Sequence, residues 1–208
     1  FFLDGPGCTG KTFVYKALIA ELRASQKVVV ATAASGIASL LLEGGQTAHS
    51  VFKIPIPIDT TSTCAIEVES KHAKYLASAD LIIIDEAPMM HRHVVEAIDR
   101  SLRDILRVRD PSLLLKPFGG NVLLLAGDFR QMLAVIPRGS RSQIVGSGIN
   151  RSQLWAHFKT YRLHTNMRVS SDAMGWAARL LEIGGGIEGD DVLIPDEIAR
   201  VESLSAMI

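Results

Sequence analysis

Residues 1–12, FFLDGPGCTGKT, decide the fold of this chain. The first four predict a short buried strand, and the last eight satisfy the pattern G-x-x-x-x-G-K-[ST] at the start of a helical stretch. A glycine-rich loop between a strand and a helix turns successive N–H groups and the helix N-terminus toward one point, where phosphate groups bind. The stretch therefore predicts a phosphate-binding loop (P-loop), against the plainer alternative of a glycine turn that only starts a helix.

Within this loop the residue types match the chemistry of nucleoside triphosphates. Lys11 would reach the β- and γ-phosphates of ATP, and Thr12 would offer its hydroxyl to Mg²⁺. ATP is therefore the expected substrate and Mg²⁺ the expected cofactor. The residues expected to bind the nucleotide are Gly5, Pro6, Gly7, Cys8, Thr9, Gly10, Lys11 and Thr12.

Beyond the loop, buried strands alternate with helices. Apolar runs without polar alternation are typical of strands covered on both faces, whereas apolar residues at helical spacing mark amphipathic helices. This order predicts an α/β fold with a doubly wound, mainly parallel sheet flanked by helices, and ligands at the carboxyl ends of its strands. The expected strands are 1–4, 28–32, 81–85, 122–127 and 160–163, the expected helices are 11–25, 35–43 and 92–108, and the expected loops are 54–63 and 110–120.

Two of these strands end in polar residues that the topology brings to the P-loop. Asp85 and Glu86 follow the run 81–85, so Asp85 would hold Mg²⁺ and Glu86 would act as general base on the attacking water. Taken alone, such an acidic pair is more often a solvated strand end or a helix cap. Gln131 follows the run 122–127 and could contact the γ-phosphate, or could be a loop amide satisfied by backbone.

The order of the motifs resembles the Pif-one and RecD-like helicases of superfamily one, in particular the branch found in plants, fungi and Helitron-type transposons. The resemblance extends from about residue 2 to residue 185. It rests on GPGCTGKT (5–12), ATAASGIAS (31–39), GQTAHSVFKIP (45–55), DEAPM (85–89), KPFGG (116–120), LAGDFRQ (125–131) and LHTNMR (163–168).

This resemblance implies an ATP-dependent DNA helicase that moves 5′ to 3′ on single-stranded DNA, in repair, recombination or telomere maintenance. It gives catalytic roles to Lys11, Glu86 and Gln131, and adds Arg168 as an arginine that touches the γ-phosphate. The blocks 31–39 and 45–55 resemble those that line the strand path. Candidate DNA contacts are therefore Thr32, Ser35, Thr47, His49, Ser50 and, by stacking on a base, Phe52. Without the resemblance, a hydroxyl-rich strand end, a core phenylalanine and a satisfied histidine are each commoner than a DNA contact.

The resemblance also implies a division of the chain. Residues 1–183 would form the first RecA-like motor domain, and 184–208 a linker toward a second motor domain whose blocks are missing. A Gln-bearing adenine-recognition segment is likewise missing before residue 1. Met132 to Val135 replace the LPPV usual in the family, which puts the nearby loop in doubt.

Composition limits the remaining possibilities. Lys plus Arg and Asp plus Glu both count 22, so any nucleic-acid surface must be local rather than a global basic excess. No apolar run reaches the roughly 18 residues of a membrane helix. Cys8 and Cys64 have no metal or disulfide spacing, which favours a reducing compartment, and the resemblance implies the nucleus or the mitochondrion. We expect a monomer.

Two other functions stay open at this stage. A small-molecule kinase with a P-loop would need an acceptor pocket and a mobile lid, for which no arginine-rich segment is evident. A non-catalytic, transposon-derived remnant would explain the missing second domain, although the intact Lys11, Asp85 and Glu86 oppose it.

Overall fold

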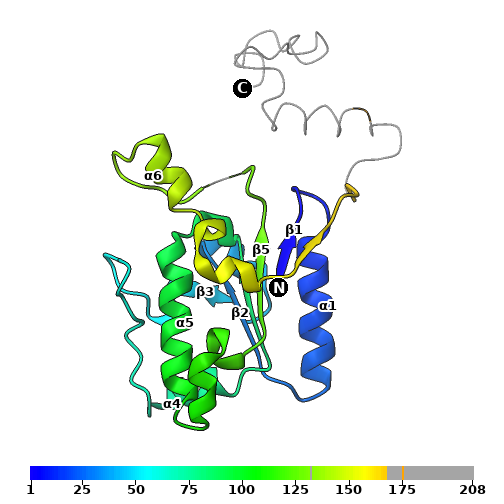
Figure 1. Ribbon diagram of the computed structural model, residues 1–208. Helices are drawn as coiled ribbons and strands as arrows, with labels where there is room; N and C mark the ends of the chain where they lie inside the picture. Colours follow the sequence, from blue (N-terminus) through cyan, green and yellow to red (C-terminus); the bar gives the residue numbers. More distant parts are fainter. Residues whose placement is uncertain (132, 168–174, 176–208) are drawn as a thin grey trace, which may run out of the picture. The chain divides into compact units, whose positions relative to one another are not determined.

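Six parallel strands of the described part of the chain form one sheet (Figure 1). The computed structural model describes residues 1–131, 133–167 and 175. The strand order is β3-β2-β4-β5-β1-β6, so β1 lies between β5 and β6. The strands are β1 (Phe2–Asp4), β2 (Val29–Ala33), β3 (Gln46–Thr47), β4 (Leu81–Asp85), β5 (Leu123–Gly127) and β6 (Thr160–Arg162).

Helices cover both faces of this sheet. Helix α1 (Lys11–Ala24) and helix α2 (Gly36–Leu40) contribute to the core on one face, and α3 (Ala48–Phe52), α4 (Lys71–Ala77) and α5 (Arg92–Leu106) to the core on the other. Figure 1 shows α1 on one side of the strands and α4 and α5 on the opposite side. The other helices of the described residues are α6 (Arg141–Gly146) and the 3-10 helices η1 (Ala87–Met89), η2 (Pro111–Leu115), η3 (Pro117–Gly120), η4 (Ile149–Arg151) and η5 (Gln153–His157).

Burial along the chain explains this layering. Ile82, Ile83 and Ile84 are consecutive and fully buried, which requires apolar neighbours on both faces of β4. On α5, Ile98 and Leu102 are buried at a spacing of one helical turn and face the core. Each such side chain stabilises the fold by roughly 1.5–3 kcal/mol relative to an exposed position. The apolar pattern therefore fixes β4 as a central strand.

The expected doubly wound α/β fold is confirmed, with strand bounds within one residue of those expected. Helix α2 is shorter than the expected 35–43, since it ends at Leu40; a turn follows that includes Gly44, whose φ is +67°. Segment 54–63 is irregular as expected, whereas 110–120 contains η2 and η3 instead of a plain loop. Strand β3 and helices α3, α4 and α6 were not expected.

The domain prediction is only partly covered by the structure. Residues Phe1–Arg168 belong to one compact unit. The linker expected at 184–208 lies outside the described residues, and the boundary at 183 stays a prediction. Both cysteines are free thiols. Among the described residues, no helix combines the length and apolar character that crossing a bilayer requires.

Candidate functional site

The P-loop connects β1 to α1 with a backbone that only particular residues adopt. Gly10 precedes α1 as its N-cap with a φ of +93°, and Cys8 also has a positive φ of 67°. The Thr9 hydroxyl donates to the carbonyl oxygen of Pro6 at 2.8 Å and holds the loop closed. A Cβ on Gly5 would lie 2.6 Å from Thr9 Oγ1, so the first glycine of the motif is required by close packing.

Lys11 folds its side chain over the same loop. Its ammonium group donates to the carbonyl oxygens of Gly5 at 2.6 Å and Pro6 at 3.2 Å. The neighbouring Thr12 is partly exposed at the start of α1. Lysine and hydroxyl therefore both lie at the helix N-terminus, where the helix dipole also favours an anion.

Asp85 ends the central strand β4 and is only 4% exposed. Its Oδ1 accepts hydrogen bonds from the Tyr15 hydroxyl at 3.0 Å and from the backbone N–H of Glu86 at 2.9 Å. Burial raises the pKa of Asp85, while these two donors and the charge of Lys11 act in the opposite direction. The effect of the Lys11 charge on the pKa of Asp85 is consistent with one site that contains both the loop lysine and this carboxylate.

Glu86 follows in an unusual conformation. Its φ of 53° and ψ of 34° are left-handed, which directs the chain from β4 into η1. Burial raises the pKa of Glu86, followed by repulsion from Asp85, whereas Lys11 lowers it. A carboxylate whose proton affinity is increased in this way is suited to accept a proton from water.

The turn after β5 brings a third group of residues to the P-loop. Gly127 has a φ of +153° and packs so closely on Pro88 that a Cβ would lie 2.4 Å from Pro88 Cδ. A Cβ on Gly7 would lie 3.6 Å from Gln131 Nε2, so the amide of Gln131 lies against the P-loop. Asp128 is buried and bonded to Arg130 at 3.0 Å, and its charge also raises the pKa of Glu86.

The segment after β6 is attached to the P-loop as well. The N–H of Leu163 donates to the carbonyl oxygen of Asp4 at 2.8 Å, and the N–H of Met167 donates to that of Cys8 at 2.8 Å. Arg168 itself lies outside the described residues. Its predicted role at the γ-phosphate stays a prediction.

The structure does not support two of the candidate DNA contacts. Thr32 is fully buried within β2, where its hydroxyl donates to the carbonyl oxygen of Ile83 at 2.8 Å. Phe52 is 1% exposed and belongs to the hydrophobic core. Both side chains are therefore buried in this structure, which does not favour the expected DNA contacts; their role in DNA binding stays a prediction.

The other four candidate contacts remain accessible. Ser35 and Thr47 cap the N-termini of α2 and α3 through bonds of 3.2 Å from the N–H groups of Ala38 and Ser50. His49 is half-buried, and burial lowers its pKa, so the imidazole is neutral at pH 7. Ser50 is exposed.

Tyr15 is the main site residue that the sequence did not single out. An aromatic residue on an amphipathic helix predicts only a core position, and Tyr15 is indeed fully buried. Its hydroxyl becomes important only because α1 packs beside the end of β4. No signal in the sequence pairs residues 15 and 85.

The fold and the site together define a RecA-like P-loop nucleotide-binding domain. The family described as PIF1-like helicase matches residues 1–180, and the chain belongs to this family. ATP-dependent DNA helicase PIF4 of Trypanosoma brucei brucei is 34% identical over 136 residues, which cover 64% of this chain and 16% of the relative. ATP-dependent DNA helicase PIF1 of the same organism is 31% identical over 204 residues, which cover 98% of this chain and 19% of the relative.

Solved structures agree with this assignment. A crystal structure of Bacteroides Pif1 bound to ssDNA has a TM-score of 0.72 at 27% identity and covers 88% of this chain and 42% of that one. Pif1 helicase from Bacteroides in complex with ADP-AlF3 and ssDNA has a TM-score of 0.75 at 26% identity, and the match covers 95% of this chain and 44% of that one. The chain thus spans less than half the length of these similar proteins.

Proposed function

We propose that this chain is the ATP-binding motor domain of a DNA helicase that hydrolyses ATP to move 5′ to 3′ on single-stranded DNA. The observation that carries the proposal is the meeting of three loops: the P-loop with Lys11, the end of β4 with Asp85 and Glu86, and the turn after β5 with Gln131. The proteins similar to the chain include DNA helicases and a complex with ADP-AlF3 and ssDNA.

The residues present fit a Mg²⁺ ion that arrives with the nucleotide. Asp85 Oδ2 has no hydrogen-bond or ion-pair partner among the described residues, and Thr12 carries its hydroxyl at the helix start. In the described part of the chain no group of three or more His, Cys, Asp or Glu could hold a metal by itself. This agrees with Mg²⁺ coordination, which usually combines one or two protein oxygens with phosphate oxygens and water. When bound, the ion would neutralise phosphate charge.

The protein's own residues would then divide the chemistry. Lys11 and the loop N–H groups would hold the β- and γ-phosphates, and Glu86 would accept the proton of the attacking water. Gln131 would orient that water or a γ-phosphate oxygen, and Arg168 would stabilise the developing charge. Ser35, Thr47, His49 and Ser50 would contact the strand. As a DNA motor the protein would act in the nucleus or mitochondrion, and we propose that it is a monomer.

The proposal is tested by the affinity for Mg-ATP of the chain and of Lys11→Ala, each with and without a short single-stranded oligonucleotide. Removal of the ammonium group should abolish measurable binding, because the loop would lose its only lysine. The two affinities are linked. If the oligonucleotide changes the affinity for ATP by some factor, ATP must change the affinity for the oligonucleotide by the same factor.

Each result separates the candidate functions. ATP binding that depends on Lys11 and responds to the oligonucleotide supports the motor domain. Turnover stimulated by a small-molecule acceptor instead of DNA would indicate a kinase. If the folded wild-type chain bound no ATP, the remnant would be the correct interpretation and the proposal would fail.

A further inference from the structure

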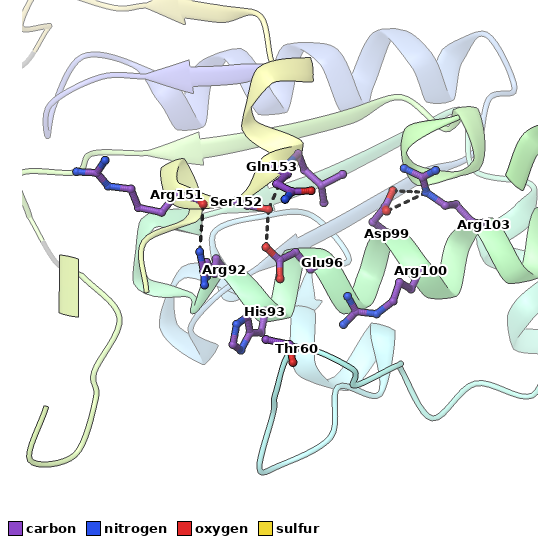
Figure 2. A pocket seen from close by; sticks show the side chains of 11 residues that line it. Thr60, Arg92, His93, Glu96, Asp99, Arg100, Arg103, Arg151, Ser152 and Gln153 are labelled. Atoms are coloured by element: carbon purple, nitrogen blue, oxygen red, sulfur yellow. Dashed lines mark hydrogen bonds and ion pairs between the residues drawn. The ribbon is translucent and has the colours of Figure 1, made fainter. Parts of the chain in front are cut away.

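A polar pocket of about 440 Å³ lies along the outer side of α5 (Figure 2). One wall is the helix itself, another is the loop 54–63 through Thr60, and a third is the segment from Arg151 to Leu154. None of the residues that bind phosphate in the proposed nucleotide site lines it. The pocket is therefore a separate feature of the molecule.

Positive charge predominates in this pocket. Arg92, Arg100, Arg103 and Arg151 contribute four guanidinium groups, against the two carboxylates of the lining, Glu96 and Asp99. Such an excess is notable in a chain whose cationic and anionic residues are equal in number, 22 of each. The pocket thus concentrates cations that the overall composition does not reveal.

Both carboxylates already have partners. Asp99 is 6% exposed, pairs with Arg103 at 2.8 Å and accepts a hydrogen bond from the N–H of Phe118. Glu96 Oε1 accepts a hydrogen bond of 2.7 Å from the Ser152 hydroxyl (Figure 2). The pair of Arg103 with Asp99 is internally neutral, so three arginines face one carboxylate.

Those three arginines keep unused donors. Arg92 donates to the carbonyl oxygen of Arg151 at 3.2 Å, and Arg100 donates to that of Ser62 through Nε at 3.0 Å. Arg151 makes no ion pair or side-chain hydrogen bond to another described residue. A guanidinium group has five N–H donors in a planar fork that matches phosphate oxygens. The pocket therefore offers several donors to an anion.

His93 provides an independent observation. Its ring lines the same pocket, and Nε2 is buried without a hydrogen-bond partner among the described residues. Buried polar atoms in native proteins almost always have a partner. Because Nε2 is covered by protein, the ring would have to turn before this atom could donate to a ligand in the pocket.

We propose that this pocket binds the sugar-phosphate backbone of nucleic acid as a second contact, outside the strand path of the proposed function on which it rests. Arg92 and Arg100 are eight residues apart on α5, or about 12 Å along the helix, which suits a repeating polyanion better than one phosphate group. Thr60 belongs to the loop that continues directly from the candidate strand-contact block 45–55. The pocket and that block are therefore neighbours along the chain.

The test uses the 208-residue chain and a long fluorescein-labelled single strand, with binding measured by anisotropy across a series of salt concentrations. The double variant Arg92→Gln, Arg151→Gln should weaken binding about tenfold and reduce the slope of log K against log salt by about 1.4, the value for two phosphate contacts. The matched control is Arg107→Gln, Arg109→Gln, which removes two exposed charges just beyond the end of α5 without touching the pocket.

A second variant gives a prediction of opposite sign. Glu96→Gln keeps an oxygen that can accept from Ser152 and removes the one carboxylate that faces the free arginines. It should tighten strand binding about threefold, since each ionic contact changes affinity by a similar factor. A folding defect cannot produce this gain.

The outcomes distinguish this inference from the proposed function. If the double variant and Glu96→Gln both bind the strand as the wild type does, the pocket inference is overturned and the motor-domain proposal stands. If the wild type binds no strand at all, both fall. A phosphoserine peptide that binds through the same arginines while the strand does not would assign the pocket to a protein partner and overturn the inference.

Discussion

The phenol of Tyr15 donates a 3.0 Å hydrogen bond to Oδ1 of Asp85 and thereby links the helix after the P-loop to the end of the central strand. Both residues are buried, at 0% and 4% exposure, and the strong desolvation and the carboxylate each raise the pKa of Tyr15. The phenol therefore stays protonated and acts only as a donor. Through this bond, the position of α1 and the orientation of the candidate magnesium ligand depend on each other.

Replacement of Tyr15 by Phe should lower the free energy of unfolding by about 1–3 kcal/mol, because a buried carboxylate loses a hydrogen-bond donor. It should also weaken Mg-ATP binding more than binding of ATP without Mg²⁺, since Asp85 loses its orientation. Urea unfolding and ATP titrations with and without Mg²⁺ measure both effects. Tyr75→Phe is the control, because that residue is 45% exposed. An equal loss in the two titrations would show that Tyr15 acts only on stability.

Glu86→Gln should keep ATP binding but reduce turnover by about 10²–10⁴-fold, the usual contribution of a general base. It should also change the pH dependence of stability. The pKa of Glu86 is raised in the folded state above its ordinary value of 4.5, so the folded state holds the proton more tightly than the unfolded state. As pH rises from 4.5 through the folded pKa, loss of this proton lowers the stability of the wild type. The variant should therefore gain in thermal midpoint relative to wild type as pH increases. A difference that is constant with pH would contradict this assignment.

Gly127→Ala should destabilise the domain by about 2–4 kcal/mol, because its Cβ would lie 2.4 Å from Pro88 Cδ at a φ of +153°. Displacement of Pro88 would also move Glu86, so turnover per folded molecule should fall. Gly146→Ala is the matched control: a Cβ there meets nothing within 4 Å, and the residue ends α6. The control should be neutral or stabilise by up to about 1 kcal/mol. Equal stabilities of the two variants in urea would refute the close contact.

Thr32→Val should cost about 0.5–1.5 kcal/mol of stability through the lost bond to the Ile83 carbonyl oxygen, and should leave strand affinity unchanged. Ser50→Ala should instead weaken strand binding and leave stability unchanged, because Ser50 is exposed in the short helix α3. Thermal unfolding and strand anisotropy on the same samples give both quantities. Weaker strand binding by a folded Thr32→Val protein would show that Thr32 contributes to strand binding.

The backbone of the nucleotide site can be predicted because local physics determines it. Glycines at positions 5 and 10 are required by a close contact and by a positive φ, and the apolar run before Asp85 is long enough to place that residue at a strand end. Parallel strands bring their carboxyl ends to one edge of the sheet. For these reasons the amino-acid sequence alone predicts that the P-loop, Asp85, Glu86 and Gln131 meet.

What escaped prediction depends on contacts between distant parts of the chain. The strand β2 was expected to end at Thr32 but continues to Ala33. Because β2 is covered on both faces, this one additional residue places the hydroxyl of Thr32 inside the protein instead of at the exposed strand end. Phe52 is apolar at the end of a short helix, and only the packed core shows that it points inward. The arginine pocket unites α5 with loop 54–63 and the segment from Arg151 to Leu154, which are distant in sequence, and no local pattern links them.

The bonds from Lys11 to the carbonyl oxygens of Gly5 and Pro6 have a consequence for ligand selection. A ligand that captures this ammonium group must compete with two oxygens of the protein itself, and an anionic oxygen at the β position competes far better than a neutral one. ADP and ATP carry that oxygen, whereas AMP and adenosine do not. We therefore expect the loop to bind ADP and ATP more tightly than AMP and adenosine, independently of contacts to the base or the sugar.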